Sequence, residues 1–160
     1  MIVLQSSVHV ANANAGEIFD FLTHPTDALY QKWWPGTHLQ LHLLDDAEAL
    51  APTRVYMDER IGDRRLRMTG IVVEAKPGRR LVWQLEKGIR LPVWLVLELN
   101  DQRDGVTVVH TIRAGFSGLG RTLDPLFRLY FSDAFARTMD EHVRTEFPKL
   151  RDLLRAEAHT

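Results

Sequence analysis

The spacing of apolar residues predicts strands over most of the first two thirds of the chain. Residues 1–10 alternate and are rich in valine, isoleucine and leucine, which is typical of a strand. Between residues 37 and 114 apolar positions recur with a period of two, interrupted by turn-forming stretches such as "KPGRR" and "NDQRDG". This pattern predicts a meander of about six antiparallel strands, and therefore a sheet of about seven strands in all.

Helices are predicted at three places. The stretch "NANAGE" supplies turn and capping residues before "IFDFL", and Thr26 is a suitable cap for a second short helix over residues 27–32. A glycine-rich break, "GFSGLGR", precedes Asp124 and Pro125, which predict the start of a long helix reaching to about residue 157. This order of elements is α+β, and a curved sheet wrapped round the long C-terminal helix would bury both apolar faces.

The predicted long helix carries two ionisable residues on its apolar face. At about 100° per residue, His142 and Glu146 fall within the apolar stripe, whereas Glu141 points away from it. An unpaired buried carboxylate costs several kcal/mol, so Glu146 needs a cation or a metal if it faces the interior. The alternatives are that the two residues pair with each other, or that Glu146 lies near a wet cavity mouth. The apolar stripe consists of Phe127, Phe131, Phe135, Met139, Val143, Phe147, Leu150 and Leu154.

A second carboxylate is predicted to point inward from the sheet. In "TRVYMDERI" alternation groups Glu59 with the apolar residues Val55, Met57 and Ile61. Two carboxylates in one cavity repel and raise each other's pKa unless a cation lies between them. A divalent metal would explain both glutamates and the histidine.

Two further histidines are candidates for the same interior. His38 follows a Pro-Gly break at the start of a predicted strand. Alternation places His38 and His42 on one face of this strand and Leu41 on the other. The alternative is therefore that both histidines are exposed to solvent. His110 shares a face with Val108 and Ile112; it is either a hydrogen-bonded core residue or a reserve metal ligand.

The element order resembles the helix-grip fold of the START and birch-pollen-allergen superfamily, called SRPBCC, which includes polyketide-cyclase-like proteins. The resemblance covers essentially the whole chain. It implies a cavity between sheet and long helix for a small hydrophobic or aromatic, polyketide-like molecule. The side chains expected to line the pocket are Trp34, Trp83, Trp94, Phe131, Phe135 and Met139.

Three short motifs carry a narrower resemblance to the diacetylphloroglucinol hydrolase family. "EHVRTEFPKL" is similar to the C-terminal helix motif in which a histidine and a glutamate four residues later bind zinc. "WWPGTH" and "YMDERIG" resemble the stretches that carry that family's strand histidine and glutamate. The resemblance implies a metal site, and two histidines with two carboxylates suit zinc, or alternatively manganese or iron. In such an enzyme His110, or a carboxylate that does not bind the metal, would move the proton. The implied metal ligands are His38, Glu59, His142 and Glu146.

Composition narrows the classes of function. The 160 residues are 45% hydrophobic, which suits a single domain over residues 1–160 with a substantial core. With 20 basic and 21 acidic side chains, no binding of nucleic acid or anionic membrane is expected. The chain contains no cysteine, which excludes disulfides, thiolate zinc sites and thiol catalysis. We see neither an export signal nor a membrane span, and expect a cytoplasmic protein.

Two functional hypotheses follow. The first is a metal-dependent hydrolase or lyase acting on a small aromatic molecule, with no organic cofactor because no P-loop or dinucleotide fingerprint occurs. The second is a non-catalytic protein that binds or transports a lipid or polyketide, with a metal-free cyclase between the two.

Overall fold

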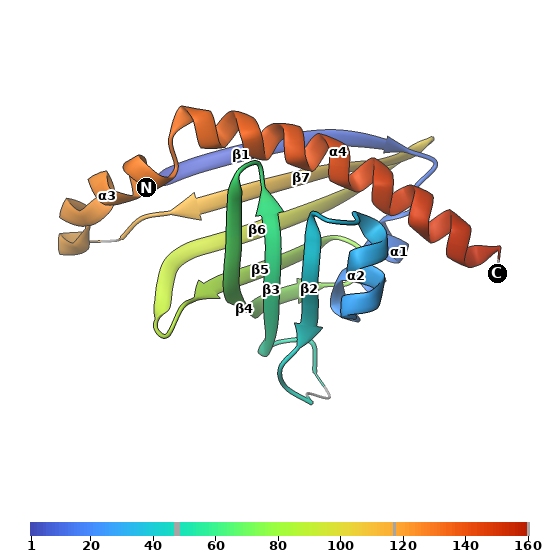
Figure 1. Cartoon of the computed structure of the whole chain (residues 1–160), viewed down its shortest axis with the longest axis horizontal. Helices are drawn as coiled ribbons and strands as arrows, with labels where there is room; N and C mark the ends of the chain where they lie inside the picture. Colours follow the sequence, from blue (N-terminus) through green and yellow to red (C-terminus); the bar gives the residue numbers. More distant parts are fainter. Residues whose placement is uncertain (47–48, 117, 160) are drawn as a thin grey trace.

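The computed structural model describes residues 1–46, 49–116 and 118–159, and it shows a curved sheet with one long helix lying along it (Figure 1). The strands are β1 (Ile2–Ala11), β2 (His38–Leu43), β3 (Thr53–Ile61), β4 (Arg64–Lys76), β5 (Arg80–Glu86), β6 (Arg90–Gln102) and β7 (Gly105–Ala114). The helices are α1 (Ala15–Thr23), α2 (Asp27–Trp33), a 3-10 turn η1 (Gly118–Leu123), α3 (Asp124–Tyr130) and α4 (Asp133–Ala158).

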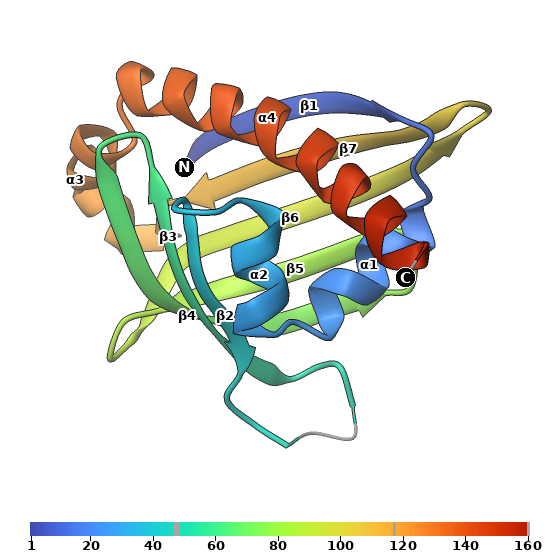
Figure 2. The same cartoon turned by 45° about the vertical axis from the view of Figure 1, so that its right-hand side comes forward.

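The sheet is an open, seven-stranded antiparallel meander, to which the first strand is added at the β7 edge. The strand order is β1-β7-β6-β5-β4-β3-β2, so the first and last strands pair, with Ser6 opposite His110. Helix α4 crosses the sheet, while α1 and α2 lie together at one end (Figure 2). The prediction of an α+β helix-grip architecture with two short helices after the first strand is therefore confirmed. Among the described residues, no helix combines the length and apolarity needed to cross a membrane.

The long helix begins later than predicted. Asp124 starts α3, which ends when the Phe131 amide donates to the carbonyl of Phe127. Ser132 then caps α4, because its hydroxyl oxygen accepts from the amide of Phe135 at 3.3 Å. The expectation of one continuous helix from Asp124 is wrong, since this second cap starts a separate helix.

Helix α4 buries the predicted apolar stripe from Phe135 onward. Phe147 and Leu150 are 2% and 0% exposed, and each such side chain contributes about 1.5–3 kcal/mol by leaving water. The same face carries His142 to a buried position, whereas Arg144 is exposed on the opposite face. The packing that stabilises the helix therefore also fixes an imidazole inside the protein.

Helix α2 points aromatic side chains at the interior. Thr26 caps it as predicted, with its hydroxyl oxygen accepting from the amide of Leu29 at 3.3 Å. Tyr30 and Trp33, one turn apart, are both buried, and Phe21 from α1 meets Trp33 edge-on at a centroid distance of 5.5 Å. Helix α2 thus presents two aromatic rings to the start of β2.

Candidate metal site and adjoining cavity

Four polar side chains from β2, β3 and α4 meet in the interior. Each offers one ligand atom, and these atoms all lie within 4.8 Å of one another. Their residues, called the His–Glu cluster below, are His38, Glu59, His142 and Glu146. They are the four predicted from the sequence as metal ligands.

The spacing of the ligand atoms suits a small cation. His142 Nε2 lies 2.8 Å from Glu146 Oε2 and 3.8 Å from Glu59 Oε2. His38 Nε2 lies 3.9 Å and 4.0 Å from the same two carboxylate oxygens. A tetrahedral zinc ion with bonds of about 2.0–2.1 Å places its ligand atoms about 3.4 Å apart. The distances between ligand atoms in the cluster lie on both sides of this value, so the spacing is close to that of a zinc site.

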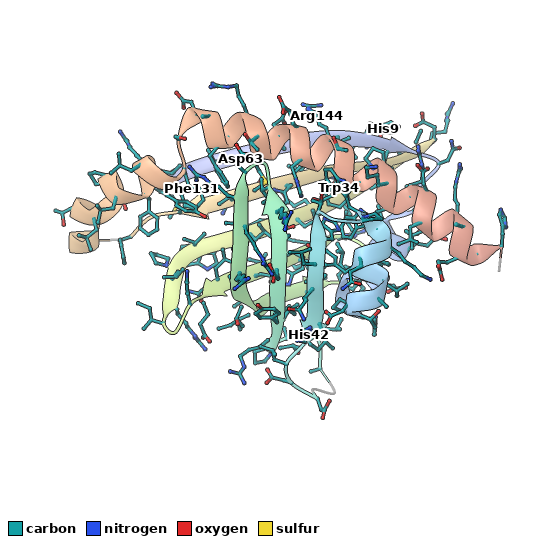
Figure 3. The ribbon with its side chains drawn as sticks, viewed as in Figure 1. His9, Trp34, His42, Asp63, Phe131 and Arg144 are labelled. Atoms are coloured by element: carbon teal, nitrogen blue, oxygen red, sulfur yellow. The ribbon has the colours of Figure 1, made fainter. Side chains whose placement is uncertain are left out.

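A β-bulge puts His38 inside. The register between β2 and β3 shifts between His38 and Gln40, so His38 and Leu41 share the inner face at 1% and 7% exposure. His42 instead pairs with Asp27 near the surface, with 2.8 Å between Nδ1 and Oδ1. Figure 3 shows His42 at the end of β2 far from α4. Strict alternation could not separate the two histidines, because the bulge breaks it.

Buried imidazole nitrogens in the cluster have no hydrogen-bond partner. Both ring nitrogens of His38 and Nε2 of His142 are inaccessible to solvent and unpartnered within the described part of the chain. Although His142 Nε2 is close to Glu146, the two are not aligned as a hydrogen bond. An unsatisfied buried polar atom costs about 1–3 kcal/mol. A metal ion would accept the lone pair of one nitrogen from each imidazole, so the residues present fit a divalent metal.

Burial shifts the pKa values of His38 and Glu59 in opposite directions, and each shift favours the neutral form. Burial lowers the pKa of His38 to about 4 despite the charge of Glu146, which leaves the imidazole neutral. Burial, followed by the charge of Glu146, raises the pKa of Glu59 to about 7. A divalent cation would favour the deprotonated form of both groups.

Glu146 and His142 behave as an opposite-charge pair. Burial by itself raises the pKa of the Glu146 carboxyl, but the adjacent His142 outweighs it and holds that pKa below its ordinary value. Burial likewise opposes the charged form of His142, yet Glu146 and Glu59 raise its pKa. In the absence of metal, the cluster therefore carries its charge mainly on these two residues.

The aromatic residues of α2 and its C-cap hold the cluster from outside. Tyr30 donates its hydroxyl to Glu59 Oε2 at 2.9 Å and stacks on His38 with ring centroids 4.0 Å apart. Trp33 donates Nε1 to the backbone carbonyl of Glu146 at 2.6 Å. These contacts fix the orientation of three members of the cluster. The sequence reading missed Tyr30 and Trp33; the signal was their one-turn spacing on a short helix just before His38.

Replacing Tyr30 by phenylalanine should lower the affinity for zinc by about tenfold, because the ring would still stack on His38 while Glu59 loses its donor. Isothermal titration of metal-free protein with zinc measures the effect. Tyr56→Phe is the matched control, since the Tyr56 ring contacts His42 near the surface, with ring centroids 5.4 Å apart and the planes tilted, away from the cluster. Equal zinc affinities for Tyr30→Phe and the wild type would contradict the role given to the hydroxyl.

A cavity of about 130 Å³ adjoins the cluster between the sheet and α4. Its walls are mostly apolar and come from β2 to β7 and from all four α-helices, and Glu59, His142 and Glu146 face into it. An apolar cavity of about 150 Å³ can hold benzene, so this one has room for roughly a single small ring. Four of the residues predicted to line a pocket do so here: Trp83, Phe131, Phe135 and Met139.

Two tryptophans lie elsewhere than predicted. Trp94 is on the other face of β6, because its neighbours Val93 and Leu95 line the cavity and side chains alternate along a strand. Trp34 is the C-cap of α2 and is not part of the cavity wall. Its ring stacks on His142 with centroids 4.8 Å apart, between α4 and the start of β2 (Figure 3). Trp34 therefore contacts the cluster, not the cavity.

His110 faces the cavity from β7. It is 8% exposed, and burial lowers its pKa, so the imidazole is neutral at physiological pH. It is not a member of the His–Glu cluster. A neutral imidazole beside a cavity can accept a proton from a molecule bound there.

Comparison with known proteins identifies the fold. No protein-family model and no curated protein matches the sequence. A protein from Nitrosomonas europaea has a similar structure, with a TM-score of 0.60 and 17% identity over 99% of this chain and 97% of that chain. Major latex-like protein 151 from Panax ginseng is similar with a TM-score of 0.58 and 9% identity, covering 88% and 96% of the two chains.

A further solved structure, that of KanY protein, gives a TM-score of 0.58 and 13% identity over 99% of this chain and 98% of that one. At such identities the likeness concerns the fold and not the chemistry. The sheet order, the long C-terminal helix and these neighbours together show that the chain has the helix-grip fold.

Proposed function

We propose that the protein is a metal-dependent hydrolase acting on a small hydrophobic, aromatic molecule bound in its cavity. The metal would be held by the four side chains of the His–Glu cluster. One observation carries the proposal: a buried set of four donor atoms, including imidazole nitrogens without partners, opens directly onto an apolar cavity.

Zinc is the metal we favour. Two imidazoles and two carboxylates are common zinc ligands, and a chain without cysteine offers no thiolate. Manganese and iron bind the same donors, so elemental analysis has to include them.

The residues around the cavity supply the other parts of such a mechanism. When bound, a divalent metal supplies Lewis acidity toward a substrate carbonyl and toward water. The neutral imidazole of His110 accepts a proton from the attacking water or returns one to the leaving group. Tyr30 keeps its proton directed at Glu59 Oε2, and the apolar walls exclude bulk water from the substrate.

Binding without catalysis is the second candidate, and the apolar lining of the cavity favours it. A carrier would hold the same ligand and release it unchanged. The His–Glu cluster would then be a structural metal site or would orient polar groups of the ligand. Turnover of the bound molecule distinguishes a hydrolase from a carrier.

The test is metal content and hydrolysis together. Protein purified without chelator should contain about one zinc per chain and should hydrolyse members of a panel of aryl esters and acylphenols. His110→Gln should lower the rate by about a hundredfold while zinc is retained, because proton transfer typically contributes at least this much. Retention of a panel compound without turnover would support the carrier. No metal at equilibrium with excess zinc would refute the metal site.

A further inference from the structure

A groove of about 510 Å³ lies at the open end of the sheet, between the start of β4, the β5–β6 turn and α3. We call it the mouth groove. Figures 1 and 2 show the β3–β4 hairpin and the β5–β6 turn diverging at this end, with α3 beside the opening. The sheet opens here because β4 pairs with β5 only from Thr69 onward. Residues 65–68 therefore have no strand on that side, and alternate backbone N–H groups point into the gap.

The mouth groove and the interior cavity share a wall. The residues that line both are Leu66, Met68, Leu85, Val93, Tyr130 and Phe131. All six are apolar or aromatic, so the boundary between the mouth groove and the cavity is apolar. A ligand longer than one ring could therefore occupy the cavity and the groove together.

The rim of the mouth groove is cationic. Arg65, Arg67 and Lys87 line it, and none of the described residues in its wall is acidic. Asp58, behind the rim, accepts from Arg65 at 2.9 and 2.7 Å and lies 3.6 Å from Arg67 Nε. One carboxylate thus faces two guanidinium groups, and exposed Lys87 adds a further positive charge. The rim keeps a net positive charge.

From this arrangement we infer that the ligand class is an amphipathic organic anion. Its apolar part enters the cavity, and its carboxylate, sulfonate or similar group stays at Arg67 and Lys87. This inference deepens the proposed function and rests on it for the reaction: the hydrolysable group would lie at the His–Glu cluster, at the end of the molecule away from the anion.

A matched pair of fluorescent probes tests the inference. 1-Anilinonaphthalene-8-sulfonate and N-phenyl-1-naphthylamine have the same aromatic skeleton and differ in the sulfonate. The wild type should bind the sulfonate more tightly. The double variant Arg67→Gln/Lys87→Gln should bind the sulfonate about tenfold more weakly and the neutral probe equally well, since each exposed charge contributes up to about fivefold. Arg103→Gln, in the exposed β6–β7 turn, is the control and should change neither affinity.

A second variant tests whether the apolar part enters the cavity. Leu66→Trp enlarges a side chain in the shared wall, so it should weaken both probes by a similar factor. Circular dichroism and thermal melting identify any variant that fails to fold. Equal affinity of the wild type for the two probes, or an unchanged preference in the double variant, would overturn the inference.

These measurements need neither metal nor turnover. If zinc fails to bind but the sulfonate preference depends on Arg67 and Lys87, the ligand class stands and the hydrolase does not. If zinc binds with no charge preference, the hydrolase stands and the ligand class does not.

Discussion

Replacing Glu146 by glutamine is expected to lower zinc affinity by two to three orders of magnitude. Zinc binding by four ligands is worth roughly 10–16 kcal/mol, or about 3–4 kcal/mol per ligand. The carboxylate of Glu146 is 12% exposed and lies closest to the imidazole of His142. A glutamine at this position has similar shape but no charge, so the change removes a ligand without leaving a void.

Glu141→Gln is the control for this experiment. Glu141 lies on the same helix, one turn before Thr145, and is exposed to solvent. Both variants lose one negative charge, so a general electrostatic effect would lower both affinities alike. Competition with a coloured zinc chelator covers the affinity range needed. If the two variants bound zinc equally well, Glu146 would not be a ligand and the proposed site would be wrong.

The sequence allowed the fold to be predicted because the largest energy contributions leave periodic patterns. Alternation over residues 37–114 and the apolar stripe from Phe135 to Leu150 reflect burial against one common core. The start of α4 was not predictable in this way. Asp124 and Ser132 both have side chains that can cap a helix, but only Ser132 does so; Asp124 is the first residue of α3, whose cap position is Leu123.

The residues of the candidate site also differ in how far regular patterns predict their positions. Helical geometry placed His142 and Glu146 inward, and strand parity placed Glu59 inward, because both follow from regular backbone. His38 depends on a bulge, and Trp34 sits at a helix cap, where no period applies. The roles of Tyr30 and Trp33 are contacts between segments distant in the chain, which no local pattern reveals.

The cluster conflicts with the hydrophobic interior in which it lies. Two carboxylates and two imidazoles are held together by elements that are stabilised by apolar packing elsewhere. In the absence of metal this arrangement costs free energy, through unpartnered nitrogens and through the repulsion between Glu59 and Glu146. Natural sequences place such local conflicts at functional sites. The free energy of unfolding of the metal-free protein measures how much this one costs.

Glu59→Gln should therefore make the metal-free protein more stable while weakening its affinity for zinc. Burial raises the pKa of Glu59 in the folded state from 4.5 to about 7. The folded state then holds a proton that the unfolded state has lost between pH 4.5 and 7, so wild-type stability falls as pH rises through that window. At about 1.4 kcal/mol per pH unit, the ionised Glu59 carboxylate lowers the free energy of unfolding of the wild type by on the order of 3 kcal/mol above pH 7. The variant lacks this titration.

Urea unfolding of both metal-free proteins at pH 4.5 and pH 8 measures the difference. The gain in the free energy of unfolding for Glu59→Gln, relative to the wild type, should be larger at pH 8 than at pH 4.5 by about 3 kcal/mol. Excess zinc should reverse the order at pH 8, because metal stabilises the folded wild type and hardly binds the variant. Glu141→Gln should follow the wild type under all these conditions. If Glu59→Gln gained no stability over the wild type between pH 4.5 and pH 8, then Glu59 would not be a carboxylate strained by burial. If zinc then stabilised both proteins equally, Glu59 would not take part in binding the metal either.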